Sequence, residues 1–167
     1  YNNNKIIARK GAVGPLASIP GLTLFGRQES LRFEQGQPKD KVVLSLDGDV
    51  GPIGLSVRST RYGKVVAPGT AVNIADPFSL TAYGPDDVFL AAKWITDLEL
   101  RARFYHRIDL AVGADNLFDV YPDRRPFGPR AVGGSYPQNF QYIPFSGGGS
   151  PFGFNGRFIY VRAGVDF

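Results

Sequence analysis

Acidic and basic side chains alternate with apolar ones between residues 93 and 103. Asp97 and Glu99 lie two positions apart, and two carboxylates on one strand face suggest acid–base chemistry. Lys93, Arg101 and Arg103 fall on the same face, because side chains of a strand alternate between its two sides. Cations interleaved with the carboxylates favour a ladder of charges that lines a polar lumen over a catalytic acid pair.

Other candidate sites for metals or phosphate lack the residues that such sites need. The chain has one histidine, His106, and no cysteine. A typical zinc site therefore has too few ligands, and we interpret His106 as a turn residue. The pairs Asp86-Asp87 and Asp119 with Asp123 match no EF-hand spacing, and the glycine-rich stretch 147–153 lacks the lysine of a phosphate loop. The sequence predicts no enzyme, no metal site and no cofactor.

The segment 118–156 carries aromatic and cationic side chains of the kinds that bind sugars or anionic chelates. Ordinary loop packing explains any one of them. As a set, we expect them to line a ligand vestibule. The candidates are Tyr121, Arg124, Arg125, Tyr136 and Tyr142.

Period-two alternation predicts that strands position these residues. In the segment 88–104, an apolar face that includes Trp94 and Phe104 opposes the charged face. No run of eighteen apolar residues occurs, which excludes a transmembrane helix but not a membrane strand. The predicted strands lie near 1–8, 41–47, 53–62, 88–104, 108–117 and 157–167.

The predicted connections alternate between short and long. Short turns at 47–52 and 104–107 separate long segments at 9–40, 63–87 and 118–156. An up-and-down outer-membrane barrel has this pattern, with short periplasmic turns and long extracellular loops. We expect an all-β, antiparallel meander of about six strands, each able to cross a membrane with about ten residues. A soluble β-sandwich alternates in the same way and stays open as the alternative.

The composition restricts the partners. The net charge of +4 is spread along the chain without a basic tract, so we expect no nucleic-acid partner. The lack of cysteine excludes disulfides. The chain also contains no methionine and no segment like a signal peptide at its start, so we expect the natural N-terminus to lie outside it.

Five short motifs follow one another along the chain. They are Glu34-Gln-Gly-Gln-Pro-Lys-Asp-Lys41, Arg58-Ser-Thr-Arg-Tyr-Gly63, Lys93-Trp-Ile-Thr-Asp-Leu98, Gly113-Ala-Asp-Asn-Leu-Phe-Asp119 with Tyr121-Pro122, and Pro151-Phe-Gly-Phe-Asn-Gly-Arg157 with the strand after it. In this order they resemble the C-terminal barrel of TonB-dependent outer-membrane receptors. The fourth looks like that family's G-x-x-N-L-F-D-x-x-P signature.

The resemblance gives two of these motifs a role. Asn116 and Asp119, with Leu117 and Phe118 between them, end a strand through local side-chain bonds, and Pro122 prevents further pairing. The last strand resembles the signal that the barrel-assembly machinery reads in this family. Its residues here are Tyr160, Val165 and the terminal Phe167, although Arg162 stands where the signal usually has glycine.

The resemblance also implies the architecture and function of a parent protein. The parent would have a 22-stranded barrel and an N-terminal plug, and this chain would be the last six strands, without the plug. The implied location of the chain is the bacterial outer membrane. Its implied partners are outer-membrane lipid, the rest of the parent's barrel and plug, and the barrel-assembly machinery. The TonB complex would be contacted through the parent's N-terminal region. The parent would import a siderophore, vitamin or oligosaccharide by energy-coupled uptake, whereas the fragment alone would not transport.

Two other functions stay open. One is a non-transporting structural or adhesive β-barrel or β-sandwich domain. The other is a carbohydrate-active β-domain, which the lack of a catalytic constellation disfavours. Detergent dependence separates the barrel from both, because a soluble domain needs none.

Overall fold

The computed structural model describes residues 1–8, 14–19, 25–69, 83–84, 87–105, 107–123 and 150–165. The chain divides into two compact units. We call Asp40–Gly63, Ala92–Pro122 and Phe152–Phe167 the sheet unit, and Tyr1–Lys39, Lys64–Ala91 and Asp123–Pro151 the helix unit.

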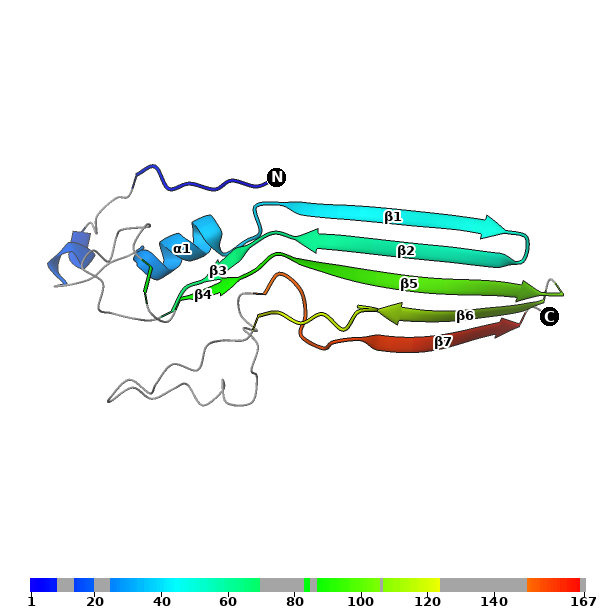
Figure 1. Ribbon diagram of the computed structural model, residues 1–167. Helices are drawn as coiled ribbons and strands as arrows, with labels where there is room; N and C mark the ends of the chain where they lie inside the picture. Colours follow the sequence, from blue (N-terminus) through cyan, green and yellow to red (C-terminus); the bar gives the residue numbers. More distant parts are fainter. Residues whose placement is uncertain are drawn as a thin grey trace. The chain divides into compact units, whose positions relative to one another are not determined.

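The sheet unit is one antiparallel sheet whose strands pair in chain order, β1-β2-β5-β6-β7 (Figure 1). Neighbouring strands are therefore joined as an up-and-down meander within this unit. The predicted all-β, antiparallel class is confirmed at this level. The strands are β1 Lys41–Val50, β2 Ile53–Tyr62, β5 Lys93–Phe104, β6 Ile108–Asp115 and β7 Phe158–Val165.

The turn between β1 and β2 is tighter than predicted. Val50 pairs with Ile53, so only Gly51 and Pro52 form the turn and β1 continues three residues past the predicted end. Gly51 has a φ of 59°, which glycine adopts without steric cost. Gly48 instead sits in the ladder opposite Leu55, so its position in a turn was wrongly predicted.

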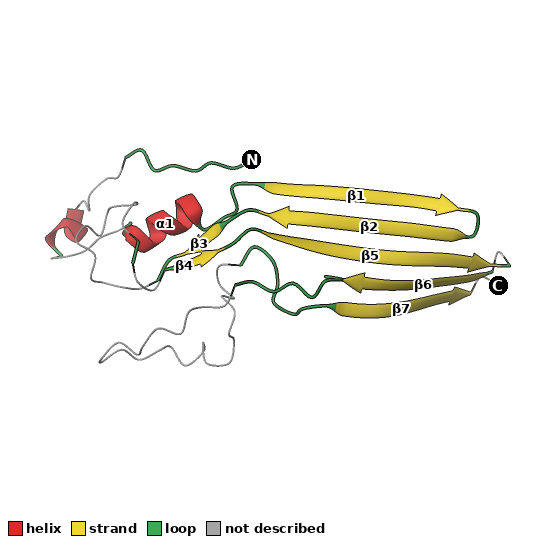
Figure 2. Ribbon diagram, viewed as in Figure 1, coloured by secondary structure: helices red, strands yellow, loops and turns green. Residues whose placement is uncertain are grey.

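The helix unit contains the helices and a second, smaller sheet (Figure 2). Leu31 of the longer helix is fully buried, and the small sheet contributes Val65 and Leu90 to the core. The elements are the 3₁₀ helix η1 Gly14–Ser18, the helix α1 Arg27–Gln35, and the paired strands β3 Val65–Ala67 and β4 Val88–Leu90.

Three predictions about these segments were wrong. Residues 1–8 form no strand: Asn2 N–H donates to the Lys39 carbonyl and Ile6 N–H to Glu34 Oε1, so this backbone bonds to α1 and the residues after it. The predicted loops 9–40 and 63–87 contain η1, α1 and β3. The helix α1 buries only Arg27, Ser30 and Leu31, which gives too weak an apolar period to be recognised.

The predicted strand 88–104 is interrupted at Ala91 and Ala92, and its two parts, β4 and β5, belong to different sheets. Ala91 N–H donates to Asp123 Oδ2 at 2.6 Å instead of to a strand. Alternation of side chains does not reveal such a break, because residues 88–104 keep their period through it.

Candidate functional site

Backbone pairing collects the charged side chains of the sheet unit on one side. Antiparallel partners share a face, and the register places Asp47, Ser56, Glu99, Gly113 and Tyr160 in one row across all five strands. The rows on either side continue it. We call this side the charged face, and its charged or hydroxyl-bearing residues are Lys41, Ser45, Asp47, Asp49, Ser56, Arg58, Thr60, Tyr62, Lys93, Asp97, Glu99, Arg101, Arg103, Asp109, Asp115, Tyr160 and Arg162.

Glu99 is the centre of a network on this face. Its Oε2 accepts a hydrogen bond from Tyr160 Oη at 2.8 Å, and its Oε1 lies 3.2 Å from Arg162 Nη2 and 3.8 Å from Arg101 Nη1. Arg103 donates to both carboxylate oxygens of Asp109, at 2.6 and 2.9 Å. The charges of this part of the ladder are therefore neutralised between strands.

Two bridges on the charged face pass over a glycine. Tyr160 on β7 reaches Glu99 on β5 across Gly113 of β6, and Asp49 on β1 reaches Arg101 on β5 across Gly54 of β2. A Cβ at Gly113 would overlap the Tyr160 ring, and one at Gly54 would overlap the Asp49 carboxylate. Glycine at these two positions lets side chains that are two strands apart meet.

Gly113→Ala is expected to destabilise the sheet unit by about 1–3 kcal/mol, because the added methyl displaces the Tyr160 ring from Glu99. The same substitution in a Tyr160→Ala background is expected to cost much less, since the clash is gone. Urea unfolding of the four proteins in a double-mutant cycle measures this coupling. Equal costs in both backgrounds would mean that Tyr160 and Gly113 do not constrain each other.

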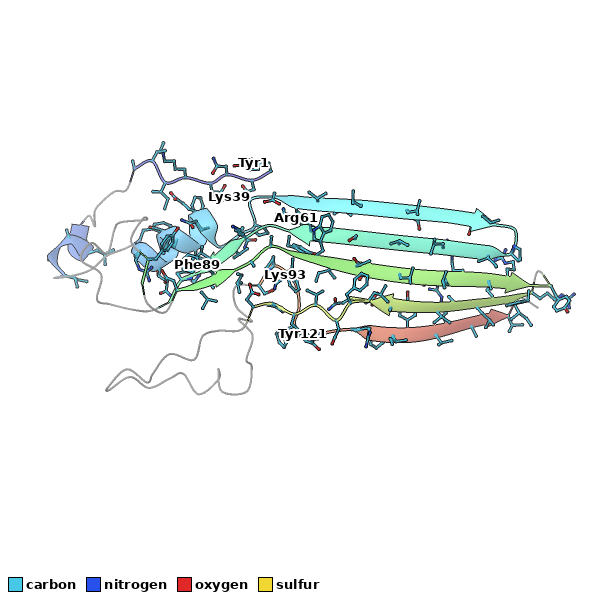
Figure 3. The ribbon with its side chains drawn as sticks, viewed as in Figure 1. Tyr1, Lys39, Arg61, Phe89, Lys93 and Tyr121 are labelled. Atoms are coloured by element: carbon cyan, nitrogen blue, oxygen red, sulfur yellow. The ribbon has the colours of Figure 1, made fainter. Side chains whose placement is uncertain are left out.

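Asp97 and Glu99 do not form the acid pair that the sequence analysis disfavoured. Asp97 Oδ1 accepts the backbone N–H of Asn116 at 2.9 Å, whereas Glu99 bonds to Tyr160 and arginines. The register places Lys93, which is labelled in Figure 3, on the same face, in a row with Lys41 and Tyr62. The two carboxylates thus have separate structural partners.

The opposite side of the sheet, the apolar face, is formed almost entirely by aliphatic and aromatic side chains that remain accessible. Leu46 is 62% exposed and Val161 is 72% exposed, although both lie in the interior of their strands. Trp94 and Phe104 stand near its two ends on β5. Its large apolar members are Val42, Leu44, Leu46, Val50, Ile53, Leu55, Val57, Trp94, Leu98, Leu100, Phe104, Ile108, Leu110, Val112, Ile159, Val161 and Val165, and its polar members are Ser59, Arg61 and Thr96.

The turn after β6 is closed by its own side chains. Asn116 and Asp119 have φ values of 52° and 56°, which asparagine and aspartate tolerate best among residues other than glycine. Asn116 donates to the Val120 carbonyl and accepts the Val120 N–H, and Asp119 Oδ1 accepts the Arg157 N–H at 2.8 Å. The bond to Asp119, together with burial, raises the pKa of the Tyr121 hydroxyl.

The other residues of the predicted turn motif, Leu117, Phe118 and Pro122, lie next to the hydrogen bonds of Asn116 and Asp119. Leu117 N–H donates to the Thr96 carbonyl at 2.7 Å, Pro122 is buried, and Phe118 is 68% exposed. The Tyr121 hydroxyl bonds to the Asp119 side chain, and both groups lie where a Cβ at Gly156 would stand. Tyr121 is labelled in Figure 3. This geometry ends β6 and ties it to the residues that precede β7.

The predicted assembly signal falls on both faces of β7. Tyr160 lies on the charged face, whereas Val165 pairs with Ile108 on the apolar face. Several other predicted residues lie outside the described part of the chain, and the structure says nothing of them. They are Phe167, Arg124, Arg125, Tyr136, Tyr142, His106 and Asp86.

The helix unit holds a buried ion pair between Arg27 and Asp87 that was not predicted from the sequence. The Asp87 carboxylate accepts two hydrogen bonds from Arg27, at 2.7 and 3.0 Å, and one each from the N–H groups of Gly69 and Gly84, both at 2.8 Å. Burial alone would raise the pKa of Asp87, but these four bonds outweigh it and hold the pKa below its ordinary value. The pair links α1 to the β3 and β4 segments, and a separation of 60 residues left no local signal.

Comparisons with protein-family models, with curated proteins and with solved structures found no match to this chain. None of its described helices combines the length and apolar character needed to span a membrane. Within the described ranges, no three histidine, cysteine, aspartate or glutamate side chains are grouped so that they could hold a metal ion. The distinctive feature of the sheet unit is therefore the contrast between its two faces.

Proposed function

We propose that this chain is part of the barrel wall of a TonB-dependent outer-membrane receptor, and that its parent takes up a siderophore, vitamin or oligosaccharide by energy-coupled transport. The observation that carries the location is the contrast between the faces of the five-stranded sheet. One face is apolar and exposed, and the other carries charges paired between strands. A barrel in a bilayer has this arrangement, with lipid outside and a polar lumen inside.

The height of the apolar face supports lipid as its occupant. Trp94 and Phe104 lie ten positions apart in β5, which is ~33 Å along a strand at ~3.3 Å per residue. A tilt of ~45° reduces this to ~23 Å, close to the ~25 Å apolar band between the aromatic girdles of such barrels. The two aromatic residues would then stand at the two membrane interfaces.

A soluble sandwich would need a second sheet of similar size to cover the apolar face. The other sheet in the described part of the chain consists of β3 and β4, with three residues each. A sheet of two such short strands is too small to cover the apolar face of a sheet whose strands have 8 to 12 residues. This size difference favours lipid over a second layer.

The edges of the sheet support a larger parent. In the described residues, β1 and β7 each pair with one neighbour only, and an open edge of this length invites pairing with further strands. We propose that both edges continue into the remaining strands of a 22-stranded barrel, which would hold the plug. The contact with the TonB complex belongs to the parent's N-terminal region, and the barrel-assembly machinery would insert the whole protein.

The membrane location is tested with Trp94, because it is the sole tryptophan of the chain. In lipid vesicles, its fluorescence is expected to be quenched by lipids brominated near the head group and to be shielded from aqueous iodide. A chain that is fully β-structured, soluble and monomeric without detergent would refute the location and favour the adhesive or structural domain.

Transport is tested separately in cells. Deletion of the gene is expected to abolish energy-dependent uptake of one solute among siderophores, vitamins and oligosaccharides, and a variant of the parent that lacks its TonB-contacting segment should not restore it. Normal uptake of all three classes after deletion would refute the transport role while leaving the membrane location intact.

A further inference from the structure

The helix unit contains an open cleft of about 440 Å³, and its described lining comes from that unit alone. Its apolar wall includes the buried residues Val65 and Leu90. Clefts of about 300–1,000 Å³ with a largely apolar lining and a few converging polar groups are typical small-ligand sites. The lining of this cleft has that composition.

Two aromatic rings stand at the cleft in a defined arrangement. Tyr83 and Phe89 meet edge to face, with ring centroids 4.9 Å apart and an interplanar angle of 75°. Tyr83 Oη also donates to Gln35 Oε1 at 3.0 Å. Both rings are about half exposed, at 45% and 56%. They therefore offer a fixed apolar surface on which a flat or ring-shaped ligand can stack.

The polar groups of the cleft favour an anion. Lys39 and Lys64 both line it and are exposed, and neither ammonium group forms an ion pair with a described residue. The described lining includes no carboxylate. Gln35 and Gln37 add amide groups that can donate to hydroxyl oxygens.

We propose that this cleft binds an acidic sugar, with the sugar ring on Tyr83 and Phe89 and the carboxylate held by Lys39 and Lys64. Lys39 and Phe89 are labelled in Figure 3. An acidic sugar uses every kind of group in the lining, because its C–H face stacks on aromatic rings, its hydroxyls bond to the amides and its charge pairs with the lysines. An aromatic acid would leave the two glutamines without a role. Binding rests on the helix unit alone, whereas acidic sugar as the transported solute rests also on the proposed function.

The test is saturation-transfer NMR and calorimetry on the full chain dispersed in detergent, with D-glucuronate as the acidic sugar, D-glucose as the neutral probe and benzoate as the aromatic acid. Glucuronate is expected to bind about tenfold more tightly than glucose, as one charge-assisted contact at an accessible site allows. Lys39→Gln with Lys64→Gln should remove this preference and leave glucose binding unchanged. Phe89→Ala should weaken both sugars.

The matched control is Lys5→Gln with Arg32→Gln, which removes two exposed positive charges outside the cleft. It should change glucuronate affinity by less than about twofold, because neither side chain lines the cleft and exposed charges are screened by salt and water. The proposal is overturned if glucuronate binds no better than glucose, if the two lysine substitutions have no effect, or if benzoate binds as tightly as glucuronate. A chain that proved soluble without detergent would refute the membrane location, yet its glucuronate binding could be measured in the same way.

Discussion

Asp87→Asn is expected to destabilise the helix unit by about 3–5 kcal/mol, because it leaves the Arg27 guanidinium buried without its counter-charge. The Arg27 side chain is only 5% exposed and that of Asp87 is fully buried. An asparagine also cannot accept all four hydrogen bonds that the carboxylate accepts. Hydrogen-exchange mass spectrometry of α1 measures the effect as a loss of about two or more decades of protection.

The matched control for this experiment is Asp109→Asn in the sheet unit. Arg103 and Asp109 form a similar two-bond pair, but it is exposed. Its loss is expected to have little effect on the stability of the sheet unit, as for other exposed pairs. Similar losses in the two units would mean that the burial of Arg27 and Asp87 has no energetic consequence.

The stabilisation from Asp87 is also expected to depend on pH. Its pKa in the folded chain lies below the ordinary value of 3.8, so the folded state favours the ionised form. The contribution is therefore fully present above about pH 5 and is lost as the pH falls below 3.8 through the folded pKa. The difference in α1 protection between the wild type and Asp87→Asn should shrink over that acidic range, and a difference that grows on acidification would contradict it.

If the sheet unit is barrel wall as proposed, Leu46→Arg is expected to destabilise the barrel in lipid vesicles by about 2–4 kcal/mol, the cost of arginine near the middle of a bilayer on the lipid-facing side. Leu46 is on the apolar face, in the row of Val57 and Leu98, about midway between Trp94 and Phe104. Urea unfolding in vesicles of the full-length protein measures the cost, since the open edges of β1 and β7 favour aggregation of the chain alone.

Ser45→Arg is the control for this substitution. Ser45 immediately precedes Leu46 in β1, is also exposed and faces the charged side, so the same charge is added at nearly the same height. Its expected effect is within about 0.5 kcal/mol. If the sheet were a soluble surface, Leu46→Arg would be neutral or stabilising, because it removes exposed apolar area. The sign of the difference between the two variants therefore distinguishes lipid from water on the apolar face.

The strands of the sheet unit were largely predictable because alternation is a local signal. The structure places β2 at Ile53–Tyr62, the predicted range, and β6 begins at the predicted Ile108. Alternation also assigned Lys93, Asp97 and Glu99 to one side of β5. It failed where a segment kept its period but changed its partner, as between β4 and β5, and where a helix buried few apolar residues, as in α1.

The partners of the charged residues were not predictable from the sequence. Tyr160 reaches Glu99 only because Gly113 lies between them in the register of β5, β6 and β7. Arg27 meets Asp87 across 60 residues. Neither pair has a spacing that a local pattern could reveal, because each depends on which strands and helices come together.

The sequence by itself determined that strands with one apolar and one charged side dominate this chain, because the direction of a side chain follows from its position along a strand. Only the tertiary structure decided the strand register and the bridges over Gly54 and Gly113. It also decided the buried Arg27–Asp87 ion pair, which links α1 to the β3 and β4 segments, and the cleft beside Tyr83. The physical reason is that these features are made by hydrogen bonds and contacts between residues far apart in the chain, and their free energy appears only after the backbone has brought them together.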